Sequence, residues 1–489
     1  MQYLIIPALA LLSLLTPAFA YLHIGSASQA ALKLDGTRFE PLLASDPATQ
    51  PNIRTRFEIT SNGSSGLYCG KPEDEFNAGY AHFTNSEGME DKHMFWWLFK
   101  ARHDPENAPL VVTFGGGPGA SALLFPFSGA GPCVIQTDKD GRGEAVPAPH
   151  SWTENANVLA LDQPVGVGFS YGHSLRNTSA ATAWDVDDFL QEFWLQYPYL
   201  VKNQFMISSG SYGGVFIPHV VNTIHSRNLE GSAKANRTIK MPESVMMANA
   251  WSDAQSHYLW FHQSNCVDNP FFNTTVCNDI VNALPGCLNA VQYAYEQSTP
   301  ANRFAAFDAC DPVTPWELAT RKNYDYREKC PATGCDMNLG PVEDVLNGQK
   351  IKEAVGVPQD RKFLIMAVDD ISMPFIYNAD AVQPAYLLLG PAIADGLRVL
   401  VYNGMMDGAV PWRSNLAWMR LLQSPHQLAF RNATEDDYPG VGTIRKAGAG
   451  PTGEFTLIKI AEAGHMVVRT RANLLQHLMA QWLQHKPFF

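Results

Sequence analysis

A serine lies between small residues at the end of a short apolar segment. In the stretch ISSGSYGGVFIPH (207–219), Ser211 follows the apolar run 204–208 and has Ser209 and Gly213 two places to either side. A serine hydroxyl becomes a nucleophile when a neighbouring base takes its proton and a third group orients that base. Small neighbours permit the tight turn that exposes such a serine. Because Gly/Ser-rich turns are common, this stretch alone is equally typical of a structural loop.

Two later residues have the types needed to complete this chemistry. VYNGMMDGAVPW (401–412) places Asp407 just beyond one predicted strand, and AEAGHMVV (461–468) places His465 just beyond the next. Loops at the carboxyl ends of parallel strands build the site of an α/β sheet. Taken singly, Asp407 is more often a turn carboxylate and His465 a surface or core histidine. Their order along the chain, each after a strand, predicts a triad with Ser211.

A glycine-rich turn could supply the hydrogen-bond donors that acyl transfer also needs. TFGGGPGASA (113–122) follows the first apolar strand, and no Gly-Lys-Ser/Thr follows it, so it is not a phosphate loop. We expect an N–H of this turn and the N–H of Tyr212 to bind the negative oxygen that develops on the substrate. The alternative is a plain tight turn.

The elements that must position these residues follow an α/β pattern. Between the second and third apolar runs, residues 178–198 show one apolar helical face with Thr178 or Ser179 as candidate cap, and a final amphipathic helix is predicted at 471–485. Strand, helix and strand in this order predict a mostly parallel central sheet with helices on both faces. The buried-strand runs are LVVTF (110–114), NVLALD (157–162), QFMIS (204–208), SVMMAN (244–249), LRVLVYNG (397–404) and FTLIKI (455–460).

Together these segments resemble the serine carboxypeptidase family of the α/β-hydrolase superfamily, in the form of a divergent fungal-type member. The resemblance rests on GGGPGAS, SWTENANVLALDQPVGVGFSY (151–171), SGSYGG, NGMMD and AGHMV, in this order. It implies an α/β-hydrolase fold whose triad is Ser211, Asp407 and His465. It also implies that Gly117 and Tyr212 supply the oxyanion N–H groups, with no metal and no cofactor.

The sequence departs from the family at the residues that bind a peptide's C-terminal carboxylate. In the family these are an asparagine and two glutamates, and here the same positions read Gly115, Gly129 and Gly210. The family's GDxD is GMMD (404–407), and the usual cysteine after GGPG is Ala120. Two close carboxyls that share a proton can hydrogen-bond a substrate carboxylate, whereas glycine offers no side chain. Recognition of a free C-terminus is therefore predicted to be weakened, or replaced by residues of the cap.

Three functions remain open on these grounds. The first is a secreted serine carboxypeptidase that releases C-terminal residues from peptides through an acyl-enzyme. The second is a related acyltransferase or esterase that acts on a small-molecule substrate, which the lost carboxylate ligands favour. The third is a non-catalytic secreted binding protein, and the complete set of triad residues argues against it.

The composition excludes some partners and leaves others open. The net charge of -12 and the absence of Lys/Arg runs argue against a nucleic-acid partner. The expected partner is a peptide or a small acyl substrate, and the oligomeric state is not indicated.

Residues 252 to about 375 interrupt the α/β pattern and carry most of the cysteines, which predicts a disulfide-rich cap inserted into one catalytic domain spanning 21–489.

Several features predict export. MQYLIIPALALLSLLTPAFA (1–20) has the apolar core and the Ala-x-Ala ending of a signal peptide, so no membrane segment is expected after cleavage. The eight cysteines are an even number, and CPATGC (330–335) lacks the second pair of a zinc site, so disulfides of undetermined pairing are expected. The destination is extracellular or vacuolar. Acceptor sequons for glycosylation occur at Asn62, Asn177, Asn236, Asn273 and Asn432.

Overall fold

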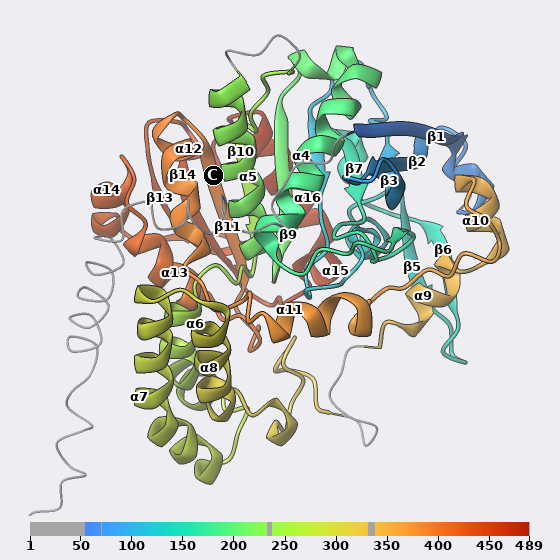
Figure 1. Cartoon of the computed structure of the whole chain (residues 1–489). Coiled ribbons are helices and arrows are strands. Elements are labelled where there is room, and N and C mark those ends of the chain that lie inside the picture. The colour runs from blue at the N-terminus through green and yellow to red at the C-terminus, as the bar shows by residue number, and fades with distance from the viewer. Residues whose placement is uncertain (1–53, 70, 232–236, 331–337, 489) are drawn as a thin grey trace, which may run out of the picture.

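The computed structural model describes residues 54–69, 71–231, 237–330 and 338–488. The predicted signal peptide and the sequon at Asn236 lie outside these residues. Figure 1 shows a central sheet with helices on both sides and a separate helical layer below it.

The central sheet is parallel in its middle and antiparallel at both edges. In the described residues its strand order is β1-β2-β3-β7-β4-β9-β10-β11-β14-β13-β12, with β8 paired to β3. The strands from β7 to β14 in this order are all parallel. The strands are β1 (Arg54–Ser64), β2 (Glu75–Thr84), β3 (Glu90–Phe99), β4 (Leu110–Thr113), β7 (Asn157–Leu161), β8 (Tyr171–Gly172), β9 (Phe205–Gly210), β10 (Ser244–Ala248), β11 (Arg398–Gly404), β12 (Asp436–Tyr438), β13 (Gly442–Ala447) and β14 (Phe455–Ile460), and a separate hairpin consists of β5 (Cys133–Thr137) and β6 (Gly143–Pro147).

The expected α/β architecture is confirmed. The six apolar runs form β4, β7, β9, β10, β11 and β14, the six parallel strands. Thr178 accepts a hydrogen bond from the Ala181 N–H and so caps the predicted helix, which is α4. The α-helices are α4 (Ser179–Gln196), α5 (Gly213–Gly231), α6 (Ala254–His262), α7 (Thr274–Glu296), α8 (Pro300–Cys310), α9 (Gly340–Leu346), α10 (Gln349–Val355), α11 (Met373–Tyr377), α12 (Gly390–Ala394), α13 (Trp412–Leu421), α14 (Gln427–Asn432), α15 (Val467–Thr470) and α16 (Ala472–Leu483).

Helices cover the sheet on both faces because alternate strand residues point to opposite sides. In β10, Met246 packs into one apolar cluster and Met247 into the other. The Met247 cluster includes α4 and α5, whereas the Met246 cluster includes α16. A strand buried on both faces needs apolar residues at every position, which explains the continuous runs in the sequence.

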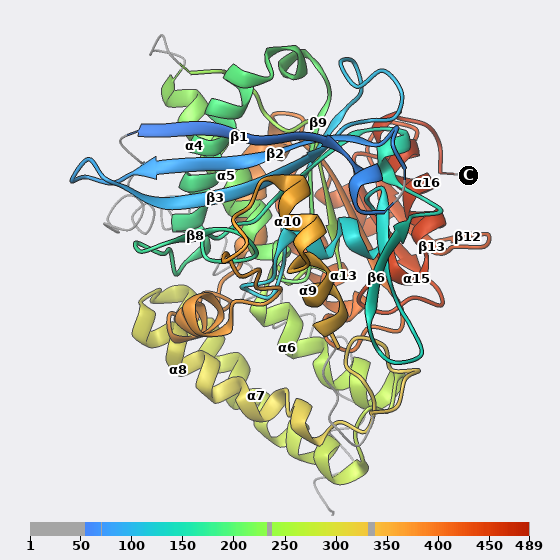
Figure 2. The same ribbon diagram turned by 90° about the vertical axis from the view of Figure 1, so that its right-hand side faces the viewer.

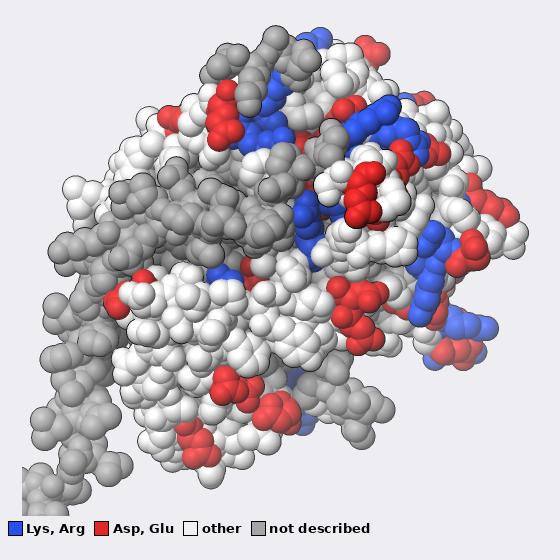
Figure 3. All heavy atoms as spheres, in the orientation of Figure 1, with Lys and Arg blue, Asp and Glu red and all other residues white. Residues whose placement is uncertain are grey.

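Within the expected insertion, α6, α7 and α8 pack around an apolar cluster of their own. Figure 2 shows these helices as a layer below the sheet, while α9 and α10 lie beside β6 and β1. Disulfides Cys266–Cys277 and Cys287–Cys310 both lie within the helical layer. The lower part of the molecule in Figure 3 shows acidic side chains with hardly any basic ones, and α7 contains no Lys or Arg.

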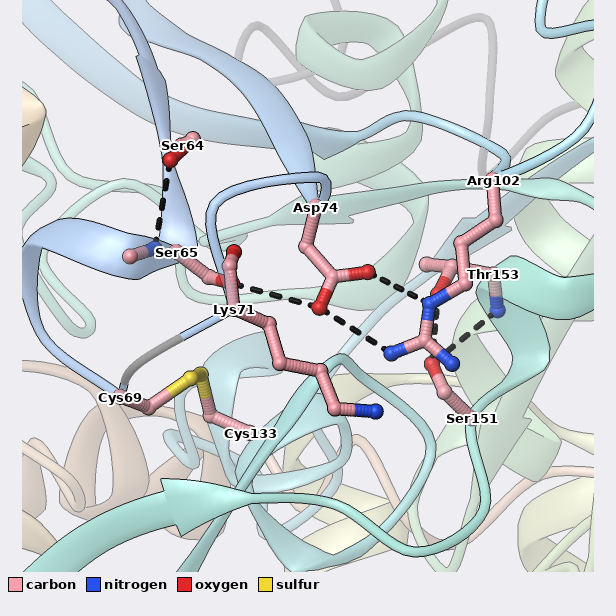
Figure 4. The surroundings of a disulfide bond; sticks show 10 residues. Ser64, Ser65, Cys69, Lys71, Asp74, Arg102, Cys133, Ser151 and Thr153 are labelled. Carbon is pink, nitrogen blue, oxygen red and sulfur yellow. Dashed lines mark hydrogen bonds and ion pairs between the residues drawn. A yellow bond between two sulfur atoms is a disulfide. The ribbon is translucent and has the colours of Figure 1, made fainter.

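A third disulfide lies on the other side of the molecule. Cys69 is bonded to Cys133 across 64 residues of chain, which stabilises the fold by about 4 kcal/mol if chain entropy alone is counted. Close to this bond in Figure 4, Arg102 forms two hydrogen bonds with the buried carboxylate of Asp74, at 2.5 and 3.0 Å. The Arg102 N–H also donates to the Thr153 carbonyl at 2.8 Å. These contacts join the antiparallel edge of the sheet to the segment that precedes β7.

Candidate active site

Ser211 occupies the sharp turn between β9 and α5. Its φ of 57° lies in the left-handed region, which is unfavourable for a residue other than glycine. The surrounding backbone holds this conformation. The Ser211 N–H donates to the Ala248 carbonyl, and the Ser211 carbonyl accepts from the N–H groups of Gly214 and Trp251, each at 2.9 Å. Ser211 thus lies on a turn between a strand and a helix, as the sequence predicted.

Ser209, two residues before Ser211, is buried and its hydroxyl has a defined partner. The Ser209 hydroxyl donates to the Phe114 carbonyl at 3.0 Å, and so connects β9 to the start of the glycine turn. A Cβ atom on Gly213 would lie 2.0 Å from the Ser209 hydroxyl oxygen. Ser209 therefore fits because Gly213 has no side chain.

Asp407 and His465 meet at the carboxyl ends of β11 and β14. His465 Nδ1 lies 2.7 Å from Asp407 Oδ2, and Asp407 is 1% exposed. The same carboxylate accepts hydrogen bonds from Asn249 Nδ2 at 2.5 Å and from the Ala409 N–H at 2.8 Å. A carboxylate fixed in this way holds the proton on Nδ1, which leaves Nε2 of His465 as the nitrogen able to accept a proton.

Two residues that support this pair were not identified from the sequence. Asn249 follows β10 with a φ of 41°, and its side-chain oxygen accepts from the Gly404 N–H at 3.3 Å. Tyr324 belongs to the expected insertion, and its carbonyl accepts the His465 N–H at 2.7 Å. The Tyr324 and His465 ring centroids are 4.6 Å apart. An asparagine at the end of the predicted strand 244–249 was the one available signal for Asn249, whereas Tyr324 gave none.

A cavity of about 460 Å³ contains the candidate site. Ser211 and His465 both line it, and the glycine turn forms part of its wall. The remaining lining is largely apolar. The lining residues are Phe114, Gly115, Gly116, Gly117, Ala120, Ser121, Leu124, Phe125, Gly210, Ser211, Ala248, Tyr324, Leu339, Met366, Val368, Tyr402, His465, Met466, Val467 and Val468.

The glycine turn packs directly against the nucleophile turn. A Cβ atom on Gly116 would lie 2.8 Å from the Gly210 carbonyl oxygen and 3.0 Å from Ser211 Cβ, so only glycine permits this approach. In the described part of the chain, the N–H groups of Gly117 and Tyr212 donate to no other backbone group. No other backbone group therefore competes for these two N–H groups, and their role as oxyanion donors remains a prediction.

At Gly115 and Gly129, where the family has carboxylate-binding side chains, backbone atoms lie close to the position of a side chain. A Cβ atom on Gly115 would lie 1.8 Å from the Ala120 carbonyl oxygen. Gly129 has a φ of 129°, and its Cβ atom would lie 2.9 Å from the Val468 carbonyl oxygen. The sequence indicated only that side chains are absent here, whereas the structure shows that none can be accommodated at Gly115 without moving the turn.

This crowding gives a prediction about stability. We expect Gly115→Ala to lower the free energy of unfolding by about 3 kcal/mol or more, because the added methyl group collides with backbone. Gly210→Ala is expected to cost less, about 1 kcal/mol, since its Cβ atom would lie 3.0 Å from the methyl group and 3.1 Å from the carbonyl oxygen of Ala248. Urea unfolding of both variants measures the difference, and equal losses would contradict this account.

Asp162 anchors the far end of the glycine turn. One carboxyl oxygen accepts from the Ser121 hydroxyl at 2.5 Å and from the Ala122 N–H at 3.0 Å. The other accepts from the Phe169 N–H at 3.0 Å. Burial raises the pKa of Asp162 to about 7, although these donors act in the opposite direction. Asp162 thus joins the cavity wall to the loop after β7.

The raised pKa of Asp162 predicts how stability depends on pH. Because the folded protein holds this proton more tightly than the unfolded chain, its stabilising effect is complete below the ordinary pKa of 3.8 and is lost as the pH rises through about 7. We expect this group to lower the free energy of unfolding by about 1 kcal/mol per pH unit across this window. Urea unfolding across the window should give a flatter pH dependence for Asp162→Asn than for the wild type. The same slope in both proteins would show that Asp162 does not titrate there.

The described sequons differ in exposure. Asn62, Asn273 and Asn432 are exposed, and Asn177 is partly buried. Asn273 caps α7 through its side-chain oxygen, which accepts from the Val276 N–H at 3.0 Å. The side-chain nitrogen, which would carry a glycan, is not used in this cap. Glycosylation at all five sequons remains a prediction.

Comparison with known proteins gives a consistent family match. The family model for serine carboxypeptidase matches residues 70–485. Carboxypeptidase Y homolog A of Podospora anserina is 32% identical over 417 residues, which cover 83% of this chain and 72% of that protein. Carboxypeptidase Y homolog A of Aspergillus niger is 30% identical over 443 residues, which cover 88% of this chain and 75% of that protein.

A solved structure supports the fold independently. The crystal structure of Kex1(delta)p, a prohormone-processing carboxypeptidase from Saccharomyces cerevisiae, matches with a TM-score of 0.71 at 16% identity. The match covers 87% of this chain and 95% of that one. In the described residues, no helix has both the length and the apolar character needed to cross a bilayer. The fold and the extent of the sequence match lead to one conclusion: the chain belongs to the serine carboxypeptidase family, within the α/β-hydrolase superfamily.

Proposed function

We propose that this chain is a hydrolase that forms an acyl-enzyme on Ser211. The observation that supports this most directly is the 2.7 Å contact between His465 and Asp407, in the cavity that Ser211 also lines. A left-handed turn presents the serine, and the adjacent glycine turn offers free N–H groups. A merely structural histidine would not need this combination of neighbours.

The proposed reaction proceeds in two halves. Ser211 Oγ attacks the substrate carbonyl carbon while His465 Nε2 takes its proton, and Asp407 stabilises the resulting imidazolium. The N–H groups of Gly117 and Tyr212 hold the oxyanion. The tetrahedral intermediate collapses when His465 gives the proton to the leaving group, and the acyl group stays on Ser211. Water then attacks the ester, with His465 again as base, and restores the free enzyme.

Two substrate types fit this chemistry. The release of C-terminal residues from peptides is the first candidate, because the family and the relatives are named as carboxypeptidases. Hydrolysis of an ester, or transfer of the acyl group to a small alcohol or amine, is the second. The backbone that fills the positions of Gly115 and Gly129 favours the second candidate.

We also propose that the protein is exported. The described disulfides fit an oxidising compartment. Cleavage of the signal peptide after Ala20 would release the mature chain to the vacuole or the exterior.

A serine-directed fluorophosphonate probe tests the nucleophile. We expect stoichiometric labelling of the purified protein at Ser211, located by mass spectrometry, together with turnover of a blocked dipeptide or of its methyl ester. Labelling at another serine, or no labelling of folded protein, would overturn the proposal and favour a non-catalytic binding protein.

A further inference from the structure

The cavity includes the space beside the His465 imidazole, because both Ser211 and His465 line it. His465 donates its proton to the leaving group, so that group must lie next to the imidazole. Met466, Val467 and Val468, which directly follow His465, line the same cavity. With about 460 Å³, the cavity has the size of a small-molecule binding site.

The lining of this cavity offers no charge to a carboxylate. The lining residues include no Asp, Glu, Lys or Arg, and their one histidine, His465, is hydrogen-bonded to Asp407. The Ser121 hydroxyl donates a hydrogen bond to Asp162, so it is not available to donate to a ligand. The rest of the lining is largely aliphatic and aromatic. A carboxylate buried here without a partner would be strongly disfavoured.

Two backbone carbonyl oxygens lie close to the Cβ positions of Gly115 and Gly210, two glycines that line the cavity. They belong to Ala120, beside Gly115, and to Ala248, which lies 3.1 Å from the Cβ position of Gly210. A carbonyl oxygen accepts hydrogen bonds and carries partial negative charge, so it repels a carboxylate. The Ala248 oxygen already accepts the Ser211 N–H at 2.9 Å, so neither carbonyl offers a donor to an anionic group.

We propose that the leaving group of this enzyme is uncharged and apolar. Substrates whose leaving group lacks a free carboxylate, such as apolar amides, esters or C-terminally blocked peptides, are accepted in preference to peptides with a free C-terminus. This inference rests on the proposed acyl-enzyme function and concerns only the group that departs.

Two amides that differ only in the carboxylate test the proposal directly. One is a blocked alanyl-phenylalanine with a free C-terminus, and the other is the 2-phenylethylamide of the same blocked alanine. We expect kcat/KM for the phenylethylamide to exceed that for the free acid by at least about tenfold, because no Lys or Arg lines the cavity to pair with the buried carboxylate. Equal values, or a preference for the free acid, would overturn the proposal.

A matched pair of variants adds a cation inside and outside the cavity. Leu124 lines the cavity, whereas Leu195 on α4 is 65% exposed. We expect Leu124→Lys to raise kcat/KM for the free acid relative to the phenylethylamide by about tenfold, and Leu195→Lys to leave the ratio unchanged. An unchanged ratio in folded Leu124→Lys would contradict the assignment of this cavity to the leaving group.

Fluorophosphonate labelling distinguishes a failure of the leaving-group proposal from a failure of the acyl-enzyme function. If Ser211 is labelled and the free acid is still preferred, the leaving-group proposal is wrong and the acyl-enzyme function stands. If Ser211 is not labelled and neither amide is cleaved, the acyl-enzyme function itself is wrong.

Discussion

Ser211→Ala is expected to lower kcat by about five to six orders of magnitude, because the atom that attacks the carbonyl is removed. The fold should persist. Alanine adopts the left-handed conformation no less readily than serine, and the hydrogen bonds that hold this turn come from backbone groups. The free energy of unfolding should change by less than about 1 kcal/mol. Steady-state kinetics and urea unfolding measure the two quantities.

Ser209→Ala is the matched control, since it removes a hydroxyl two residues away from the nucleophile. The Ser209 hydroxyl donates to the Phe114 carbonyl, and Ser209 does not line the cavity. We expect this variant to lose stability by about 1 kcal/mol and to keep most of its activity. Comparable activity losses in the two variants would show that Ser211 acts through the structure of the turn and not as the nucleophile.

Asp407→Asn should lower kcat by about four orders of magnitude. An asparagine at this position either turns its NH₂ group toward His465 or leaves the imidazolium without a counter-charge. In both cases the proton relay from Ser211 fails. Asn249 Nδ2 and the Ala409 N–H also donate to the present carboxylate, so the new NH₂ group would meet donors on every side.

Asp253→Asn provides a control for the loss of a buried carboxylate. Asp253 caps α6 and accepts hydrogen bonds from the Ser256 N–H and the Tyr295 hydroxyl. Asparagine is also a good helix cap, so this variant should retain activity. An Asp407→Asn variant as active as Asp253→Asn would refute the assigned role of Asp407.

The parallel part of the fold was predictable because of where its strands lie. A strand buried on both faces is apolar at every position, and such runs are visible in the sequence. The positions of Ser211, Asp407 and His465, each just after a strand, followed from the same runs. The antiparallel edge strands β1 to β3 were not identified, because their pairing depends on partners that a local pattern does not specify.

Other parts of the site depend on contacts between distant segments. Asn249 reaches Asp407 across 158 positions in the sequence, and Tyr324 comes from the insertion to support His465. The sequence showed that Gly115 has no side chain. It could not show that the Ala120 carbonyl occupies the vacant position, because that depends on the path of the backbone.

The short disulfide loops of the helical layer have a consequence for the order of events during synthesis. Cys266–Cys277 and Cys287–Cys310 close after 11 and 23 residues, whereas Cys69–Cys133 spans 64. The ribosome completes both short loops before it reaches β11 and β14. The central sheet therefore lacks these two strands when the loops can close. Because a folding chain forms units in the order in which they emerge, the helical layer can mature as a cross-linked unit while the central sheet is unfinished. Asp407 and His465 arrive last, so the proposed active site forms only once the whole sheet has been made.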